Sequence, residues 1–366
     1  MIEQLSSLSV EQKIGQLFFI GIGGPELDQA TSSLLAEVSP GGVCLFARNI
    51  KGFVQTRELL DGIRRSSDIE PFLSIDQEGG LVDRLRRIMT PMPAASKLPS
   101  PALAAEQGAI IGETLGILGF NMDFAPVVDV IDEERGKHSN GLFSRTYGAS
   151  KKVAAEFAGA FLESLQSKNI IGCLKHFPGL GAAQVDSHEE LPVVNIPAAE
   201  LDDTDLFPYR KLLKTTDVHA VMAAHVCFPD HPLQEKDANG KLLPASLSYS
   251  FITKLLRGDM GFDGVVITDD LEMGAIMRNY GIGEACKMAV LAGVDLLAIC
   301  ADAENIRSGY KYVCDAVNNG EISIELIDAS LARIAKVKAM LAVPPIFDTE
   351  RLDALSAETA SFAAKI

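Results

Sequence analysis

A chain of 366 residues can hold one large α/β barrel or two ordinary domains, and either would bury a sizeable core. Its 33 Lys and Arg residues against 49 Asp and Glu give a formal net charge of -16. That charge argues against an extended contact with a phosphate backbone, so we expect no nucleic acid partner. No apolar run of the sequence approaches the ~20 residues that span a bilayer, so we also expect no membrane partner.

Eight short apolar runs alternate with helix-length segments along the chain. The runs are rich in β-branched and aromatic residues, as expected for strands buried on both faces. They lie at residues 15–22, 41–46, 71–75, 120–127, 170–177, 218–226, 264–268 and 293–299. Segments between them, such as 101–116 and 150–167, repeat apolar residues at intervals of three and four, which predicts amphipathic helices.

This alternation predicts a TIM (β/α)8 barrel, as a single domain over residues 1–366. Residues 323–341 predict one more amphipathic helix, which closes the ring at the C-terminal end. A doubly wound open sheet is the alternative fold, because the number of strands is hard to establish from a sequence.

The N-terminus and the cysteines predict the compartment. The first charged residue of the segment MIEQLSSLSVEQKIGQLFF is the acidic Glu3, and the segment lacks the basic start of a secretion signal. The six cysteines are scattered singly, without Cys-x-x-Cys spacing, which is typical of buried thiols in a reducing environment. We therefore expect a cytoplasmic protein. The oligomeric state stays open.

Polar residues follow four of the predicted strands at the point where each strand ends. In a TIM barrel, the residues just past the C-terminal ends of the strands form the active face. Any one of them alone could be a barrel-rim residue with satisfied hydrogen bonds, but four strand ends together favour a site. These residues are Asp76, Lys175 with His176, His225, and Asp269 with Asp270.

The loop after the fifth strand, KHFPGLGAAQVDSHEELP, carries a second set of polar residues. Asp186 and His188 are two residues apart, so in an extended segment their side chains point to the same side. The carboxylate can then hold one ring nitrogen of His188 while the other transfers a proton near neutral pH. Gly179 and Gly181 allow such a loop to swing over a site. The alternative is a capping turn in which Asp186 or Ser187 starts a helix through Glu189 and Glu190.

The seventh strand ends in two consecutive aspartates. A carboxylate at the end of a buried strand is costly unless it is paired, hydrogen-bonded or functional, which makes Asp269 a candidate nucleophile. Asp270 points the other way if the strand alternation continues, and we expect it to cap the following helix.

Six motifs follow one another along the chain: DQEGG, NMDFAPVVDV, RTYG, KHFPG-x-G with DSH, PASLS and GFDGVVITDDLEM. Taken together, they resemble those of the family 3 glycoside hydrolases, in particular their single-barrel β-N-acetylglucosaminidase branch. The resemblance covers residues 10–340 and implies a retaining exo-glycosidase with Asp269 as nucleophile and the His188–Asp186 pair as acid/base. It implies no cofactor and no metal.

The same resemblance assigns the substrate-binding residues. It implies that Asp76 accepts hydrogen bonds from the terminal sugar, and that Arg84, Arg145, Lys175 and His176 also contact the sugar. The expected partner is a small glycoside or a muropeptide fragment of the cell wall.

Two positions depart from the commoner family pattern. Leu81 stands where the EGG segment usually continues with Arg, and Leu180 stands where the loop usually has His between its glycines. Both departures put the aglycone preference in question more than the reaction.

Other functions stay open at this level. Within the family, the alternatives are a β-N-acetylglucosaminide phosphorylase and a β-glucosidase. From another class, a metal-dependent TIM-barrel hydrolase could use His176, His188, His225 and Asp269 as ligands, although their spacing matches no known metal site. A sugar-binding barrel without activity is possible if the DSH segment is only a cap.

Overall fold

The computed structural model describes residues 4–5, 7–137, 141–142 and 144–366. In this part of the chain, eight parallel strands form one sheet in the order β10-β1-β2-β3-β6-β7-β8-β9. The strands are β1 Phe18–Gly21, β2 Gly42–Leu45, β3 Phe72–Ile75, β6 Met122–Asp123, β7 Ile171–Phe177, β8 Ala220–Ala223, β9 Val265–Thr268 and β10 Leu297–Ile299. A small antiparallel hairpin, β4 Gln77–Gly79 with β5 Val82–Asp83, follows β3.

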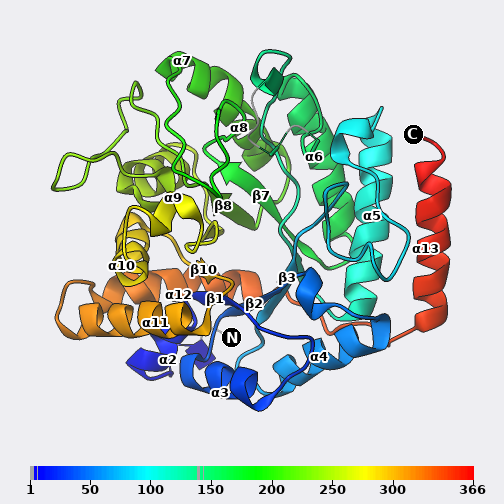
Figure 1. Cartoon of the computed structure of the whole chain (residues 1–366), viewed down its shortest axis with the longest axis horizontal. Helices are drawn as coiled ribbons and strands as arrows, with labels where there is room; N and C mark the ends of the chain where they lie inside the picture. Colours follow the sequence, from blue (N-terminus) through cyan, green and yellow to red (C-terminus); the bar gives the residue numbers. More distant parts are fainter. Residues whose placement is uncertain (1–3, 6, 138–140, 143) are drawn as a thin grey trace.

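The sheet closes on itself. The two strands at the ends of the order, β9 and β10, meet through a parallel bridge between Ile267 and Leu296. Thr268 donates its backbone N–H to the carbonyl of Leu296 at 3.0 Å, and Asp295 donates to Val266 at 2.9 Å. The helices surround the strands (Figure 1). The predicted TIM barrel is therefore confirmed, and the open sheet is excluded.

All eight predicted strands are present, although several are shorter than their apolar runs. The run 15–22 begins inside helix α2, so β1 starts only at Phe18. The run 120–127 yields the two-residue strand β6 and a later isolated bridge between Val127 and Lys175. Pro126 lies between them and has no N–H to donate to a ladder, which interrupts the strand.

The helices follow the predicted positions closely. Residues 101–116 and 150–167 form α5 and α6, and the Ser100 and Ser150 side chains accept the N–H groups of Leu103 and Val153 as N-caps. The α-helices from α2 onward are α2 Val10–Gly15, α3 Gln29–Val38, α4 Phe53–Arg65, α5 Pro101–Leu118, α6 Lys151–Gln166, α7 Ala198–Glu200, α8 Leu206–Thr215, α9 Gly274–Met277, α10 Ile282–Ala292, α11 Ala303–Asn318, α12 Ile324–Lys338 and α13 Thr349–Ala363.

Shorter helical turns fill several connections. The π-helical segments are Leu201–Asp205 and Ser250–Asp259. The 3₁₀ turns are Ala47–Asn49, Ala95–Lys97, Arg135–Lys137 and Ala245–Leu247.

The C-terminal region contains one helix more than the sequence predicted. The predicted closing helix is α12, which packs against α2 and β9. After it, α13 lies along the outside of α5 (Figure 1). On its other side α5 packs closely on α6, where a side chain at Gly108 would place its Cβ only 2.4 Å from the carbonyl oxygen of Phe161.

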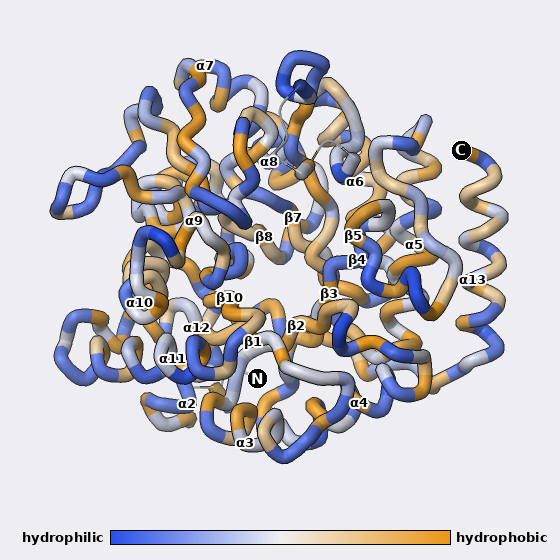
Figure 2. Tube along the Cα trace, in the orientation of Figure 1, coloured by the Kyte–Doolittle hydropathy of each residue, from blue (hydrophilic) through white to orange (hydrophobic). Residues whose placement is uncertain are grey.

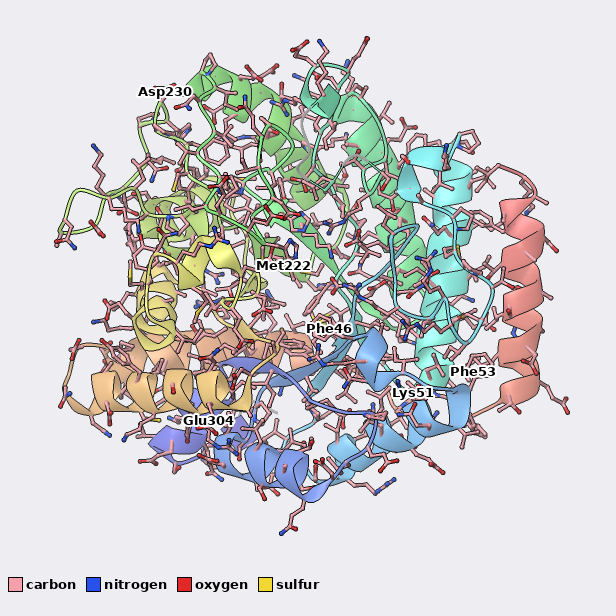
Figure 3. All side chains as sticks on the ribbon, in the orientation of Figure 1. Phe46, Lys51, Phe53, Met222, Asp230 and Glu304 are labelled. Carbon is pink, nitrogen blue, oxygen red and sulfur yellow. The ribbon has the colours of Figure 1, made fainter. Side chains whose placement is uncertain are left out.

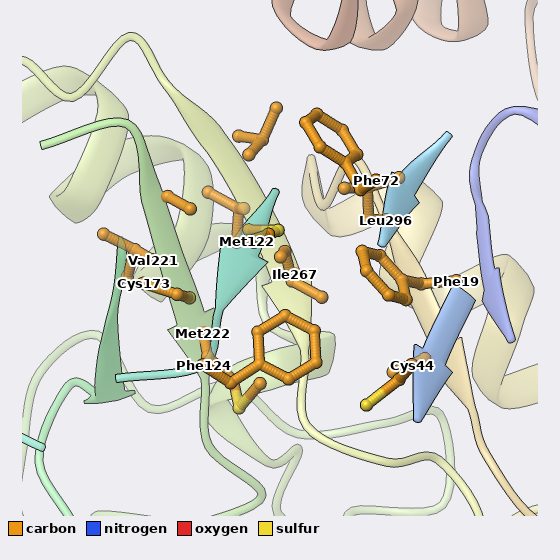
Figure 4. Close-up of a cluster of buried hydrophobic side chains, with 14 of the residues drawn as sticks. Phe19, Cys44, Phe72, Met122, Phe124, Cys173, Val221, Met222, Ile267 and Leu296 are labelled. Atoms are coloured by element: carbon orange, nitrogen blue, oxygen red, sulfur yellow. The ribbon is translucent and has the colours of Figure 1, made fainter. Parts of the chain in front are cut away.

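Apolar side chains fill the barrel interior. The rings of Phe19 and Phe72 stack with centroids 6.4 Å apart, and the ring of Phe124 lies 5.2 Å from that of Phe19. Figure 4 shows these three rings together with Met122 and Ile267. The central strands are mostly hydrophobic, whereas outer helices such as α11 and α13 alternate in hydropathy (Figure 2). These side chains form packed layers inside the barrel, beneath the C-terminal ends of the strands.

Two further expectations concerned membrane-spanning segments and the burial of the cysteines. No helix in the described residues is both long and apolar enough to cross a membrane. All six cysteines lie within the described residues and are free; five are buried and Cys314 is half-buried. The expected buried thiols are thus present at five of the six positions.

Candidate active site

A cavity of about 320 Å³ opens at the C-terminal ends of the strands. Phe124, Met222 and Cys44 line it from the barrel interior, and Phe46 lines it from the loop after β2 (Figures 3 and 4). All eight residues predicted from the sequence as catalytic or sugar-binding line this one cavity. They are Asp76, Arg84, Arg145, Lys175, His176, Asp186, His188 and Asp269.

A buried cluster of charges lies at one side of the cavity. Lys175, at the end of β7, donates from Nζ to Asp76 Oδ1 at 2.7 Å and lies 2.5 Å from Glu78 Oε1. Arg145 donates from Nε to Glu78 Oε2 and from Nη2 to Glu78 Oε1, both at 2.8 Å. A bidentate pair of this kind holds both side chains in one orientation. Glu78 thus holds two cavity cations in place.

The charges in this cluster shift one another's pKa values. Burial alone would raise the pKa of Asp76, but the charges of Lys175 and Arg84 outweigh it and hold that pKa well below its ordinary value. Burial also opposes ionisation of Glu78, yet Arg145 and Lys175 lower its pKa to about 2. Burial would lower the pKa of Lys175, but Asp76 and Glu78 raise it above its ordinary value. At neutral pH the cluster is therefore fully ionised.

His176 is held by a second buried carboxylate. Its Nδ1 lies 2.7 Å from Asp129 Oδ2, and its Nε2 lies 3.3 Å from Arg145 Nη2. Asp129 also accepts the backbone N–H of Leu180 at 2.6 Å, which fixes the start of the loop after β7. Asp129 therefore orients the His176 ring, and the ring faces Arg145 in the cavity wall.

Arg84 is held more loosely than the other cations. Its Nη2 lies 3.4 Å from Asp76 Oδ2, and its guanidinium lies 5.8 Å from the centre of the Phe46 ring. Within the described residues, the buried Nε of Arg84 has no hydrogen-bond partner. Arg84 is therefore restrained by fewer hydrogen bonds than Arg145 or Lys175.

Asp186 and His188 form a dyad on the loop after β7. Asp186 Oδ1 lies 2.7 Å from His188 Nδ1 and also accepts the backbone N–H of His188 at 2.9 Å. The carboxylate is stabilised by these bonds, which outweigh its partial burial and lower its pKa. The His188 side chain is 69% exposed, so its Nε2 is open to a ligand. Residues 187–189 form a turn, not the expected extended segment. The Asp186 carbonyl accepts the N–H groups of Glu189 at 3.0 Å and Glu190 at 3.2 Å, so Asp186 caps this single turn and also pairs with His188.

The two aspartates after β9 differ in their bonding. Asp269 accepts the N–H of Asp270 at 2.9 Å, while its own N–H donates to Ala223. Asp270 Oδ1 accepts N–H groups from Glu272 at 3.0 Å and from Cys300 at 3.3 Å, and burial raises the pKa of Asp270 to about 7.

Two expectations about Asp270 need correction. Asp270 lines the cavity together with Asp269, rather than pointing away from it. It also does not cap the next helix. It holds the turn after β9, and α9 begins only at Gly274, with Met273 as its N-cap.

Two charged residues of the site were missed by the sequence analysis. Glu78 and Asp129 stand inside the motifs DQEGG and NMDFAPVVDV, of which the sequence analysis selected only Asp76 as a site residue. Both are buried carboxylates, at 4% and 1% exposure, and their partners are distant in the sequence. For Asp129, a charged residue inside a largely apolar motif was the signal that could have identified it.

The remaining positions singled out from the sequence are His225, Leu81 and Leu180. His225 is fully buried, with Nδ1 2.7 Å from Ser246 Oγ and Nε2 3.1 Å from the Asp270 carbonyl, as expected for a core histidine. Leu81 stands at the turn of the β4–β5 hairpin, 64% exposed, and lines the cavity. Leu180 is buried at the cavity wall. Among the described residues, no group of three or more His, Cys, Asp or Glu side chains has the arrangement of a metal site.

The Glu78→Gln variant is expected to have a lower free energy of unfolding, because it leaves Lys175 and Arg145 buried without their shared counter-charge. Breaking a buried ion pair typically costs about 3 kcal/mol or more. The folded-state pKa of Glu78 is depressed, so its stabilisation is present above pH 4.5 and is lost as the pH falls toward 2. Urea unfolding at several pH values should therefore show a large difference from the unmodified chain at pH 7 that shrinks in acid.

Glu58→Gln, at an exposed position of α4, provides the matched control and should leave stability unchanged. An equal stability of Glu78→Gln and the unmodified chain at pH 7 would show that the charge cluster contributes nothing to folding.

Comparison with known proteins gives this site a context. Residues 9–337 match the sequence model described as the glycosyl hydrolase family 3 N terminal domain. A beta-hexosaminidase of Tolumonas auensis is 32% identical over 305 residues, covering 82% of this chain and 86% of the relative. Beta-hexosaminidase A of Pseudoalteromonas piscicida is 30% identical over 338 residues and 87% of this chain, but this chain spans only 55% of its length.

A solved structure agrees with these matches. A glycoside hydrolase family 3 beta-N-acetylglucosaminidase from Paenibacillus superposes with a TM-score of 0.86 at 33% identity, covering 97% of this chain and 69% of that one. The resemblance that the motifs indicated is thereby confirmed. With a family match over most of its length, this chain belongs to family 3 of the glycoside hydrolases.

Proposed function

We propose that this chain is a retaining exo-β-N-acetylglucosaminidase, with Asp269 as nucleophile and His188 as general acid and base. One observation carries the proposal: the wall of a single cavity holds a strand-end carboxylate and an exposed imidazole. The Nδ1 of that imidazole is already bonded to Asp186 at 2.7 Å. A retaining mechanism needs these two functions, a nucleophile and a proton donor that later acts as a base.

The proposed reaction has two steps. In the first, Asp269 attacks the anomeric carbon while the protonated His188 gives its Nε2 proton to the departing glycosidic oxygen. In the second, water attacks the same carbon and releases Asp269, and the now neutral Nε2 takes the proton of that water. Asp186 keeps Nδ1–H hydrogen-bonded throughout, which orients the ring in both steps.

The buried charges are assigned to sugar binding. We assign Asp76 as acceptor and Arg84, Arg145, Lys175 and His176 as donors or orienting groups toward the hydroxyls of the terminal sugar. Support comes from the ionised cluster around Asp76 and Lys175, which presents fixed acceptors and donors at the cavity wall. Arg84 is included because it lines the same cavity, with its Nη2 3.4 Å from Asp76 Oδ2.

We infer a terminal β-linked N-acetylglucosamine as the sugar, since relatives over most of the chain are named beta-hexosaminidase or beta-N-acetylglucosaminidase. A cavity of about 320 Å³ lies near the small end of the ~300–1,000 Å³ range of ligand pockets, which suits the end of a short glycoside. We propose muropeptide fragments of the cell wall as the natural source and the cytoplasm as the place of reaction. We also propose that residues 1–366 act as one catalytic domain.

A panel of aryl β-glycosides tests this function. The N-acetylglucosaminide should be cleaved with kcat/KM at least ~10²-fold above the glucoside and the xyloside, because a polar pocket discriminates by the hydrogen bonds it is built to make. Free N-acetylglucosamine should be the product with or without phosphate, and a chelator should leave the rate unchanged.

Other outcomes of the panel identify the alternatives. A sugar 1-phosphate product would indicate a phosphorylase, and a preference for the glucoside would indicate a β-glucosidase. Loss of activity on chelation that zinc restores would indicate a metal-dependent hydrolase. Absence of cleavage of every glycoside would indicate a sugar-binding barrel.

A further inference from the structure

The loop that carries His188 is docked on the short helix that follows Asp269. The backbone N–H of Gly274 donates to the carbonyl of His188 at 3.0 Å, and that of Ala275 donates to the carbonyl of Ser187 at 3.2 Å. These two donors are the first two residues of α9. The loop that bears His188 and the helix that follows Asp269 are thus joined through main-chain hydrogen bonds.

This docking requires the absence of a side chain at Gly274. A Cβ built there would lie 2.3 Å from the carbonyl oxygen of Glu189 and 2.7 Å from that of His188. Both are backbone atoms of the loop, so they cannot rotate away as the end of a side chain would. Gly274 lies at a helical position that alanine adopts readily, so the clash would act on the loop and not on α9.

The start of α9 is itself fixed relative to Asp269. The Met273 N–H donates to the Asp270 carbonyl at 3.0 Å, and the Glu272 N–H donates to the Asp270 side chain. The Glu272 carboxylate accepts N–H groups of Ala301 at 2.5 Å and Asp302 at 3.0 Å beyond β10. The Gly274 and Ala275 N–H groups that bind the loop are therefore fixed relative to the ends of β9 and β10.

We propose that Gly274 is a positioning residue, which seats the loop so that His188 stands at a working distance from the sugar bound over Asp269. This inference rests on the proposed roles of His188 and Asp269. Because His188 is 69% exposed and its ring is bonded to Asp186 of the same loop, the ring does not anchor the loop to the barrel. The main-chain bonds to α9 supply that anchor.

The Gly274→Ala variant should lose about 10²-fold in kcat on glycosides with poor leaving groups, because displacement of a catalytic group by about 1 Å costs that much. Activated aryl glycosides, which need little protonation, should keep their rate of glycosylation, and KM should change little. Gly281→Ala is the matched control. Gly281 is the N-cap of α10, and a Cβ there meets no atom within 4 Å, so its kinetics should equal those of the unmodified chain.

Two further measurements separate this inference from a general loss of structure. In a His188→Ala background, Gly274→Ala should cause no additional loss, because the residue acts only through His188. Independently of any activity, the N–H groups of Gly274 and Ala275 should be protected from hydrogen exchange in the unmodified chain. Gly274→Ala should increase exchange in residues 184–191.

The outcomes that overturn the inference are distinct from those that overturn the proposed function. Unprotected Gly274 and Ala275 amides, or equal losses on good and poor leaving groups, would show that Gly274 does not position the loop. If the amides are protected but His188→Ala is fully active, the docking stands and the role of His188 is wrong, and with it the role inferred for Gly274.

Discussion

Replacement of Asp269 by Asn is expected to lower hydrolysis by roughly 10⁴-fold or more on every leaving group, because it removes the covalent route itself. A slow fluorinated analogue of the N-acetylglucosaminide should leave a covalent sugar on the peptide containing VVITDDLEM, since fluorine slows both steps and a good leaving group rescues only the first. Mass spectrometry of the digested protein should locate the sugar on Asp269. Asp269→Asn should abolish the labelling.

Asp270→Asn is the matched control for that experiment. The amide keeps the oxygen that accepts the N–H groups of Glu272 and Cys300, so the turn after β9 should be preserved. Burial already raises the pKa of Asp270 to about 7, so a neutral side chain at this position resembles one of its two states near neutral pH. Labelling should persist in this variant. A label on Asp270, or a trapped oxazoline with no label on the protein, would contradict the assignment of Asp269.

The His188→Ala variant is expected to lose activity selectively. General acid and base assistance is typically worth roughly 10² to 10⁴-fold, so glycosides with poor leaving groups should lose rate in that range. Activated aryl glycosides should form the covalent intermediate at an almost unchanged rate, because their leaving groups depart without a proton. Pre-steady-state release of the aryl group measures that step separately from the second.

Asp186→Asn complements the His188 experiment. The amide oxygen can still accept the His188 N–H groups, but the negative charge that stabilises the imidazolium is lost. Proton donation should therefore weaken without disrupting the turn, which gives a loss of the same selectivity but smaller than that of His188→Ala. Equal losses on good and poor leaving groups in either variant would show that the dyad is structural.

Much of this protein's architecture could be predicted from local sequence patterns. The eight apolar runs predicted the eight strands, because strands buried on both faces need continuous apolar side chains. The position of polar residues at the ends of those runs predicted that Asp76, Lys175 and Asp269 share one face. Parallel strands in a barrel all present their C-terminal ends to the same side, so that inference required no knowledge of distances.

The tertiary structure decided which groups are partners. Glu78 bonds to Arg145, 67 residues away, and His176 bonds to Asp129, 47 residues away. Periodicity describes one segment at a time, whereas ion pairing and hydrogen bonding depend on distances between segments that meet only on folding. The contact of His188 and Ser187 with α9 also depends on folding. The need for a glycine at position 274 can be recognised only once the loop is seen to lie against it. The sequence alone thus determined the barrel and the face that bears the site, while the contacts that orient its charges and seat its loop arose from packing between distant segments.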